Sequence, residues 1–123
     1  MSQLLDAEID VNQRVAAAVA LLSHFSIGSD FLAGEPLMRR ISPLLESPEL
    51  TALNRTYWWL YTGYHYHLLA RRNECEAAFQ RCARIAVESG LVQAEVVLNS
   101  MRCYHLAQWN DARFGSALQA LKR

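Results

Sequence analysis

The sequence predicts an all-α fold, a right-handed stack of about three antiparallel helical hairpins. Apolar residues recur at helical spacing along most of the chain, and no segment shows the alternation typical of a half-buried strand. Residues 57–78 and 91–112 can also be laid over one another with an offset of 34, which places Ala78 on Ala112. A repeat of this length indicates that one helical hairpin recurs along the chain.

An offset of 34 is the period of the tetratricopeptide hairpin. Such a hairpin buries its apolar face only by stacking on its neighbours, and the stack presents a concave surface to a partner. The sequence therefore predicts a binding function rather than a chemical one. Its 123 residues are an ordinary size for one domain, so we expect a single helical-repeat domain over residues 1–123.

Two helices are expected in the first third of the chain. The first runs from about residue 3 to residue 23, with its apolar positions on one face. Glycine, serine, aspartate and proline gather in residues 24–36, which indicates a turn. The second helix starts near residue 37, and Pro43 should kink it or end it early because proline has no backbone donor.

A long third helix is expected to begin at the signal Ser47-Pro48-Glu49 and to run to about Arg72. Ser47 is suited to cap free amides, Pro48 loses no bond at the first helical position, and Glu49 suits the positive end of the helix dipole. Because it is apolar on two sides, this helix should lie between neighbours. Its two faces are Leu50, Leu53, Tyr57, Leu60, Tyr64 and Leu68 on one side, and Trp58, Tyr61 and His65 on the other.

Three more helices are expected after this one. Asn73 and Glu76 have the spacing of a capping box at the start of the fourth, and Gly90 is placed to close it after Ser89 as a left-handed cap. The fifth helix spans residues 92–108, and a sixth starts near residue 109. The buried stripe of the fourth helix should be Cys75, Ala78, Phe79, Cys82, Ile85 and Ala86.

Composition narrows the class of partner. Twelve basic and twelve acidic residues give a formal charge of zero. Most proteins that bind nucleic acids or anionic membranes carry an excess of positive charge, which this chain lacks. The acidic N-terminal segment has no signal-peptide core, and no apolar run is long enough to span a membrane. We therefore expect a cytoplasmic protein, without direct contact to nucleic acid or membrane through this region.

No metal, cofactor or catalytic group is expected from the spacing of reactive residues. His65 and His67 lie two apart on a helix, so their side chains point about 200° apart and cannot share one ion. Cys75 and Cys82 share a helix face but lie about 10 Å apart, too far for a disulfide, and are interpreted as small core residues. Cys103 has no neighbouring base. Because no catalytic constellation assembles, the chain is not expected to be an enzyme.

The tract of residues 57–66 is the most aromatic part of the chain. Its rings are interpreted mainly as core that covers a central helix, with a ligand cage as the alternative. Trp58 and Trp59 lie about 100° apart around the helix, so they cannot share one environment. Trp58 is expected to be the more buried of the two.

The predicted binding surface is the groove lined by the first helix of each hairpin. The repeat places His67 and Arg71 in this groove from one hairpin, and Met101 and His105 from the next. The four-residue spacing puts both members of each pair on one helix face. In the alternative interpretation, Met101 and His105 only pack against the preceding hairpin.

Several short segments also carry a resemblance to a known family. They are Ile41-Ser42-Pro43-Leu44, Pro48-Glu49-Leu50, Trp58-Trp59, Glu76-Ala77-Ala78, Cys82, Ile85-Ala86, Glu88-Ser89-Gly90-Leu91, Leu98 and Tyr104-His105-Leu106-Ala107-Gln108-Trp109-Asn110-Asp111-Ala112. Together they resemble the tetratricopeptide-like helical sensor domain of MalT-like, LuxR-type ATP-dependent bacterial transcriptional regulators. The similarity covers most of residues 37–121.

The resemblance implies a module that relays the binding of a protein or a small effector to an ATPase and a DNA-binding domain elsewhere in a longer chain. This sequence holds neither a phosphate-binding loop of the usual kind nor a basic recognition helix, so we expect a fragment of such a regulator. The alternative is a stand-alone structural adaptor that self-associates. In either case, exposed end helices would allow a homodimer.

Overall fold

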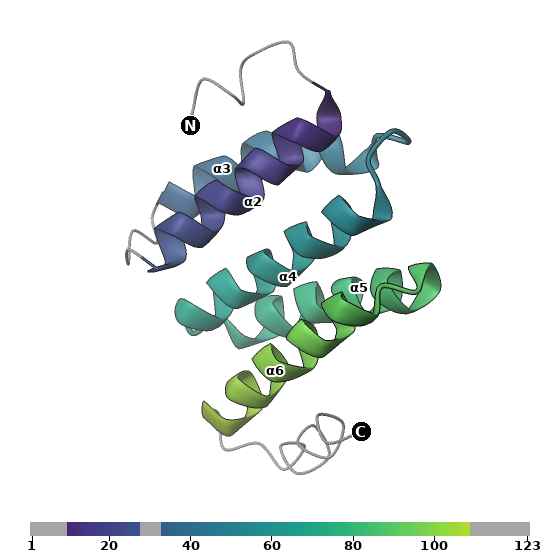
Figure 1. Ribbon diagram of the computed structural model, residues 1–123. Coiled ribbons are helices and arrows are strands. Elements are labelled where there is room, and N and C mark those ends of the chain that lie inside the picture. Colours follow the sequence, from purple (N-terminus) through teal and green to yellow (C-terminus); the bar gives the residue numbers. More distant parts are fainter. Residues whose placement is uncertain (1–9, 28–32, 109–123) are drawn as a thin grey trace.

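The computed structural model describes residues 10–27 and 33–108, and every regular element in these two ranges is a helix (Figure 1). The prediction of an all-helical chain is therefore confirmed for this part of it. The elements are α2 (Val11–Ile27), α3 (Gly34–Ile41), the short 3-10 helix η2 (Ser42–Glu46), α4 (Ala52–Leu68), α5 (Arg72–Ser89) and α6 (Val92–Gln108).

The helix α4 occupies the middle of the structure. In Figure 1 it lies between the pair α2 and α3 on one side and α6 on the other, while α5 runs alongside it. One core cluster joins α2, α3 and α4 and includes Leu22, Ile41 and Trp58. A second cluster joins α4, α5 and α6 around Leu60 and Phe79. The prediction that this helix lies between neighbours is confirmed, since each of its two faces contributes to a different core.

Polar side chains set the start of α2 and attach it to α4. Asp10 caps α2, because its Oδ1 accepts the backbone N–H of Asn12 at 2.5 Å. The Asn12 side chain then bonds the segment that leads into α4. It donates to the carbonyl of Glu49 at 2.9 Å and accepts from the amide of Thr51 at 2.8 Å. The predicted end at residue 23 is too early, because α2 continues to Ile27. The segment expected before residue 10 lies outside the described residues.

The predicted turn over residues 24–36 extends too far, because α3 begins at Gly34. Pro36 lies in the first turn of α3, where its missing N–H leaves no bond unmade.

Pro43 ends α3, as expected. The α-helix stops at Ile41, and the chain continues as η2 with Pro43 in its first turn, where the missing N–H leaves no bond unmade. A turn closed by the bond from the Leu50 amide to the Ser47 carbonyl, at 3.2 Å, then leads into α4.

Two predicted boundaries around α4 are wrong. The helix begins at Ala52 rather than at Pro48, because the hydroxyl of Thr51 caps it by accepting the Asn54 amide at 3.3 Å. It ends at Leu68 rather than at Arg72. Leu53, expected on a buried face, is 49% exposed, since it falls in the first turn of the shortened helix.

The two helix ends that follow share one turn geometry. After α4, Ala70 adopts φ 60°, and the amide of Arg71 donates to the carbonyl of Tyr66. After α5, Gly90 adopts φ 67°, and the amide of Leu91 donates to the carbonyl of Ala86. The left-handed cap predicted at Gly90 is thus confirmed.

The capping box predicted at Asn73 is wrong. The chain turns at Ala70, so α5 already begins at Arg72, and its N-cap residue Arg71 makes no side-chain capping bond. Asn73 consequently lies inside the first turn. The predicted stripe of α5 is confirmed, since all of its members are buried except Ile85, which is partly exposed. The sixth predicted helix lies outside the described residues.

Candidate functional site

A cleft of about 510 Å³ opens between α4 and α6. Its walls are largely apolar or aromatic, and Val96 and Tyr104 on α6 are 57% and 76% exposed. The hydroxyl of Ser100 and the imidazole of His67 add polar groups to this lining. The lining residues are Tyr64, His67 and Leu68 from α4, and Val96, Val97, Ser100, Met101 and Tyr104 from α6.

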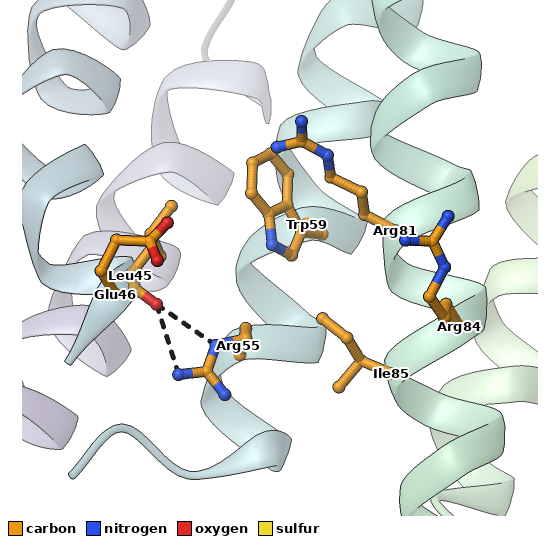
Figure 2. A pocket seen from close by; sticks show the side chains of 7 residues that line it. All are labelled: Leu45, Glu46, Arg55, Trp59, Arg81, Arg84 and Ile85. Atoms are coloured by element: carbon orange, nitrogen blue, oxygen red, sulfur yellow. Dashed lines mark hydrogen bonds between the residues drawn. The ribbon is translucent and has the colours of Figure 1, made fainter. Parts of the chain in front are cut away.

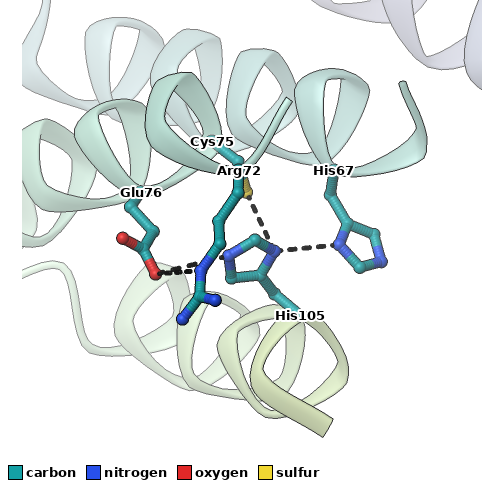
Figure 3. Close-up of polar contacts among 5 residues, drawn as sticks. All are labelled: His67, Arg72, Cys75, Glu76 and His105. Carbon is teal, nitrogen blue, oxygen red and sulfur yellow. Dashed lines mark hydrogen bonds and ion pairs between the residues drawn. The ribbon is translucent and has the colours of Figure 1, made fainter. Parts of the chain in front are cut away.

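His67 also belongs to a buried polar cluster that three helices build (Figure 3). The Nδ1 atoms of His67 on α4 and His105 on α6 lie 3.0 Å apart. The Sγ atom of Cys75 on α5 lies 3.5 Å from the same Nδ1 atom of His105. All three residues are buried, and their donor atoms lie within 4.8 Å of one another. Two imidazoles and a thiol therefore face a common point.

The fold brings these three residues together at one end of the bundle. His67 lies in the last turn of α4 and Cys75 in the first turn of α5, joined by the tight turn at Ala70. The helix α6 returns antiparallel to α5, so His105 near its C-terminal end reaches the same place. Residues 30 and 38 positions apart in sequence thus become neighbours.

Glu76 contacts the far side of the His105 ring. Its Oε1 atom lies 3.6 Å from Nε2 of His105 and 3.4 Å from Nε of Arg72. A carboxylate favours the tautomer that carries its proton on the facing nitrogen. We therefore assign the proton of His105 to Nε2, which leaves the lone pair of Nδ1 directed at His67 and Cys75.

Burial sets the protonation of the cluster. Loss of solvation, followed by the repulsion that His105 exerts when it is protonated, lowers the pKa of His67 below its usual range. Burial, with a smaller contribution from Glu76, raises the pKa of Cys75 to about 12. At neutral pH the cluster therefore holds a neutral His67 imidazole and a protonated thiol.

The four residues predicted for the groove divide between two places. His67 and Met101 line the cleft. His105 is 1% exposed and packs against His67, Cys75 and the ring of Phe79. Its contact with His67 joins α6 to α4.

Arg71 lies at the turn before α5 rather than in the cleft. Its guanidinium pairs with Glu35 and with Glu74, and lies 4.9 Å from the centre of the Tyr66 ring. These contacts connect α3 with the turn between α4 and α5. Arg71 thus holds helices together in this structure.

A second cleft, of about 470 Å³, is lined by residues of η2, α4 and α5 (Figure 2). The guanidinium of Arg81 lies 4.6 Å from the centre of the Trp59 ring, a cation–π contact. Arg55 donates to the carbonyl of Leu45 at 3.3 Å, so this side chain is engaged in closing the loop before α4. Trp58 is 1% exposed while Trp59 reaches this cleft, which confirms the predicted difference between them.

The sequence reasoning considered histidine and cysteine pairs within one helix and so missed the cluster. The prediction that Cys75 is buried is confirmed. Its contact with His105 was not predicted, because the two residues lie on different helices. One signal was available. His67 and His105 are 38 residues apart, which is the predicted period of 34 plus one helical turn, and a repeat of that period would predict that they lie at neighbouring levels.

Comparison with protein-family models, with curated proteins and with solved structures found no match to this chain. Among the residues that the structure describes, no helix combines the length and the apolar character needed to cross a membrane.

Proposed function

We propose that this chain is a non-catalytic, tetratricopeptide-like interaction module that binds an apolar segment of a protein partner, or a small apolar effector, in the cleft between α4 and α6. The observation that carries the proposal is the cleft itself, with its largely apolar lining of partly exposed side chains on two helices.

The order and packing of the helices support a repeat of this kind. The helices α4 and α5 form an antiparallel pair joined by a tight turn, and α6 follows α5 after another. The first helix of each proposed hairpin is then α2, α4 and α6, and α4 packs on both of the others. In such a stack the first helices line the concave surface, and a cleft lined by α4 and α6 is consistent with that arrangement.

The chemistry of the cleft favours an apolar ligand. Met101 adapts its shape to different ligands because its side chain is unbranched and flexible. Tyr64 and Tyr104 offer large rings with a polar tip, a combination common at recognition surfaces. Among the residues that the structure describes, the cleft is lined by no Lys, Arg, Asp or Glu, so these residues offer a highly charged ligand no ion-pair partner.

We further propose that the chain is part of a bacterial transcriptional regulator of the MalT-like, LuxR-type class. This proposal is supported by the resemblance of residues 37–121, and it makes the cleft the point at which an effector or a partner protein is sensed. Cytoplasmic location belongs to the same proposal.

A self-associating adaptor is the second candidate. It is favoured by the exposed apolar side chains of Val92, Val96 and Tyr104, which recur at multiples of four residues along α6. In that case a second copy of the chain, rather than a different protein, would cover this helix.

The proposal is tested by selecting peptides from a displayed random library on the purified chain and measuring their binding by fluorescence anisotropy. Val96→Asp introduces a charge into the cleft, and we expect it to weaken binding at least about tenfold, since a charge on an apolar surface loses solvation when the ligand covers it. Val87→Asp is the matched control, because Val87 is 64% exposed on α5 and lies outside the cleft.

Equal affinity of the Val96→Asp and Val87→Asp variants would contradict the proposal, provided that both melt as the parent does. Sedimentation equilibrium of the same variants distinguishes the two candidates. A dimer of the parent chain that Val96→Asp dissociates, without any selected peptide, would favour the adaptor.

A further inference from the structure

We propose that His67, Cys75 and His105 form a binding site for a transition-metal ion, with Zn²⁺ as the ion that suits it best. The inference rests on the buried cluster of Figure 3 and is independent of what the cleft binds.

Two of the three distances within the cluster are close to those around a tetrahedral ion. With metal–nitrogen bonds of about 2.0–2.1 Å and metal–sulfur bonds of about 2.3 Å, two ligand nitrogens lie about 3.3 Å apart, and a nitrogen lies about 3.6 Å from a sulfur. The observed separations are 3.0 Å between the two Nδ1 atoms and 3.5 Å between Nδ1 of His105 and Sγ of Cys75. An ion therefore requires shifts of a few tenths of an ångström in these two edges. The third edge, between the donor atoms of His67 and Cys75, is at most 4.8 Å, so the ion would draw these two side chains together by up to about 1.2 Å.

The donor set selects the class of ion. Two imidazoles and a thiolate suit Zn²⁺, Co²⁺ or copper, whereas Mg²⁺ and Ca²⁺ prefer oxygen donors. When the ion binds, the thiol of Cys75 gives its proton to the buffer and its sulfur becomes the ligand.

Glu76 supplies the support that metal-bound histidines commonly have. Its carboxylate faces Nε2 of His105, which places the proton there and directs the lone pair of Nδ1 at the ion. Arg72 contacts the same carboxylate oxygen and holds it in place. Glu76 is a positioning residue and contributes no ligand atom.

The position of the site predicts two effects of the ion. Its three ligands come from α4, α5 and α6, so a bound ion cross-links three helices and stabilises the folded chain. Three protein ligands also leave one tetrahedral position for water or for an added ligand. His67, which lines the cleft, is the ligand closest to where such a molecule would enter.

Hydrogen bonding within the cluster is the competing explanation. In that case the N–H of His67 donates to Nδ1 of His105, and the three polar groups satisfy each other in the core without an ion. The two explanations differ in what the chain does when Co²⁺ or Zn²⁺ is added.

The test uses the full chain without a histidine tag, stripped of metal by a chelator and titrated with Co²⁺. We expect one Co²⁺ per chain, a sulfur-to-cobalt charge-transfer band in the near ultraviolet, and the intense visible bands of tetrahedral cobalt. Zn²⁺ should displace the cobalt and raise the melting temperature.

Variants assign the ligands. Cys75→Ser should abolish the charge-transfer band and weaken binding at least about tenfold. Cys82→Ser is the matched control, because Cys82 lies on the same helix, is equally inaccessible to solvent and is outside the cluster. This variant should keep the charge-transfer band and the affinity for the ion. Glu76→Gln should keep the band and weaken binding about tenfold or more.

Failure of the parent chain to bind Co²⁺ or Zn²⁺ would overturn the proposal, and so would a charge-transfer band that survives in Cys75→Ser. A band that Cys82→Ser loses as fully as Cys75→Ser would overturn it as well. If Cys75→Ser does not fold, as judged by circular dichroism, His67→Gln decides, because it should retain the fold and lose tetrahedral binding.

Discussion

Gly63 on α4 packs against Phe79 on α5. Whether the substitution Gly63→Ala raises or lowers stability therefore depends on how closely these two helices pack. A Cβ atom added at Gly63 would lie 2.5 Å from Cδ1 and 2.6 Å from Cε1 of the Phe79 ring. Ordinary contacts between carbon atoms are about 3.5–4.0 Å, so the ring would have to move by about 1 Å. It is 1% exposed and packs in the cluster with Leu60, Cys82 and Leu98, which restricts that movement.

The Gly63→Ala substitution therefore changes stability in two opposing ways. In a helix without this neighbour, alanine is more favourable than glycine by about 1 kcal/mol. Overpacking of a core costs about 1–3 kcal/mol, and a contact this short lies towards the upper end of that range. We expect a net loss of about 1–2 kcal/mol in the free energy of unfolding.

Urea unfolding followed by circular dichroism measures this free energy, with an unchanged m-value as the check that the unfolded states are comparable. A double-mutant cycle with Phe79→Leu then isolates the contact, because the smaller side chain leaves room for the new methyl group. The double variant should be more stable than the sum of the single effects predicts, by about 0.5 kcal/mol or more. An increase in stability for Gly63→Ala alone would refute the packing of α4 on α5 described above.

Three further predictions concern the turns, the tryptophans and a buried thiol. Ala70→Gly should raise the free energy of unfolding by up to about 1 kcal/mol, because Ala70 is left-handed, and Gly90→Ala should lower it by a similar amount; urea unfolding measures both. In variants that keep a single tryptophan, acrylamide should quench Trp59 more strongly than Trp58, which is 1% exposed. Burial raises the pKa of Cys82 to about 12, against about 9 in the unfolded chain, so the folded chain holds this proton more tightly. Its contribution to stability is complete below pH 9 and is lost as the pH rises from 9 to 12, and Cys82→Ala should show a shallower decline over that range.

Each of these has an outcome that would contradict it. A loss of stability in Ala70→Gly would mean that the turn after α4 is not left-handed in solution. Equal quenching of the two tryptophans in a monomer would contradict the burial of Trp58. Parallel pH profiles for the parent chain and Cys82→Ala would show that the thiol ionises alike in both states.

Local patterns in the sequence determined the helical class and the elements with strong signals. The spacing of apolar residues predicted the buried stripe of α5, Gly90 predicted its left-handed end, and Pro43 predicted the end of α3. These features depend on residues a few positions apart, because a helix places such residues on one face and because proline and glycine act on the backbone at their own positions.

The start and the end of α4 could not be predicted from such local patterns, because several nearby residues gave competing signals. Ser47 and Pro48 resemble a helix start, yet Thr51 caps α4, since Asn12 from α2 bonds the Thr51 amide and the carbonyl of Glu49 before it. The end of α4 at Leu68 depends on Ala70, which adopts the left-handed conformation. Alanine rarely adopts this conformation, so the sequence gives no sign of a turn there.

The cluster of His67, Cys75 and His105 was decided by the tertiary structure alone. The sequence placed His67 and His105 in one groove and Cys75 in a core, and each description is compatible with many arrangements of the helices. Contact between a thiol and two imidazoles from three helices depends on the direction in which α5 and α6 return and on the level at which they stop. Those properties come from packing between distant segments, such as the Phe79 ring against Gly63, and periodicity within a single helix carries no information about them.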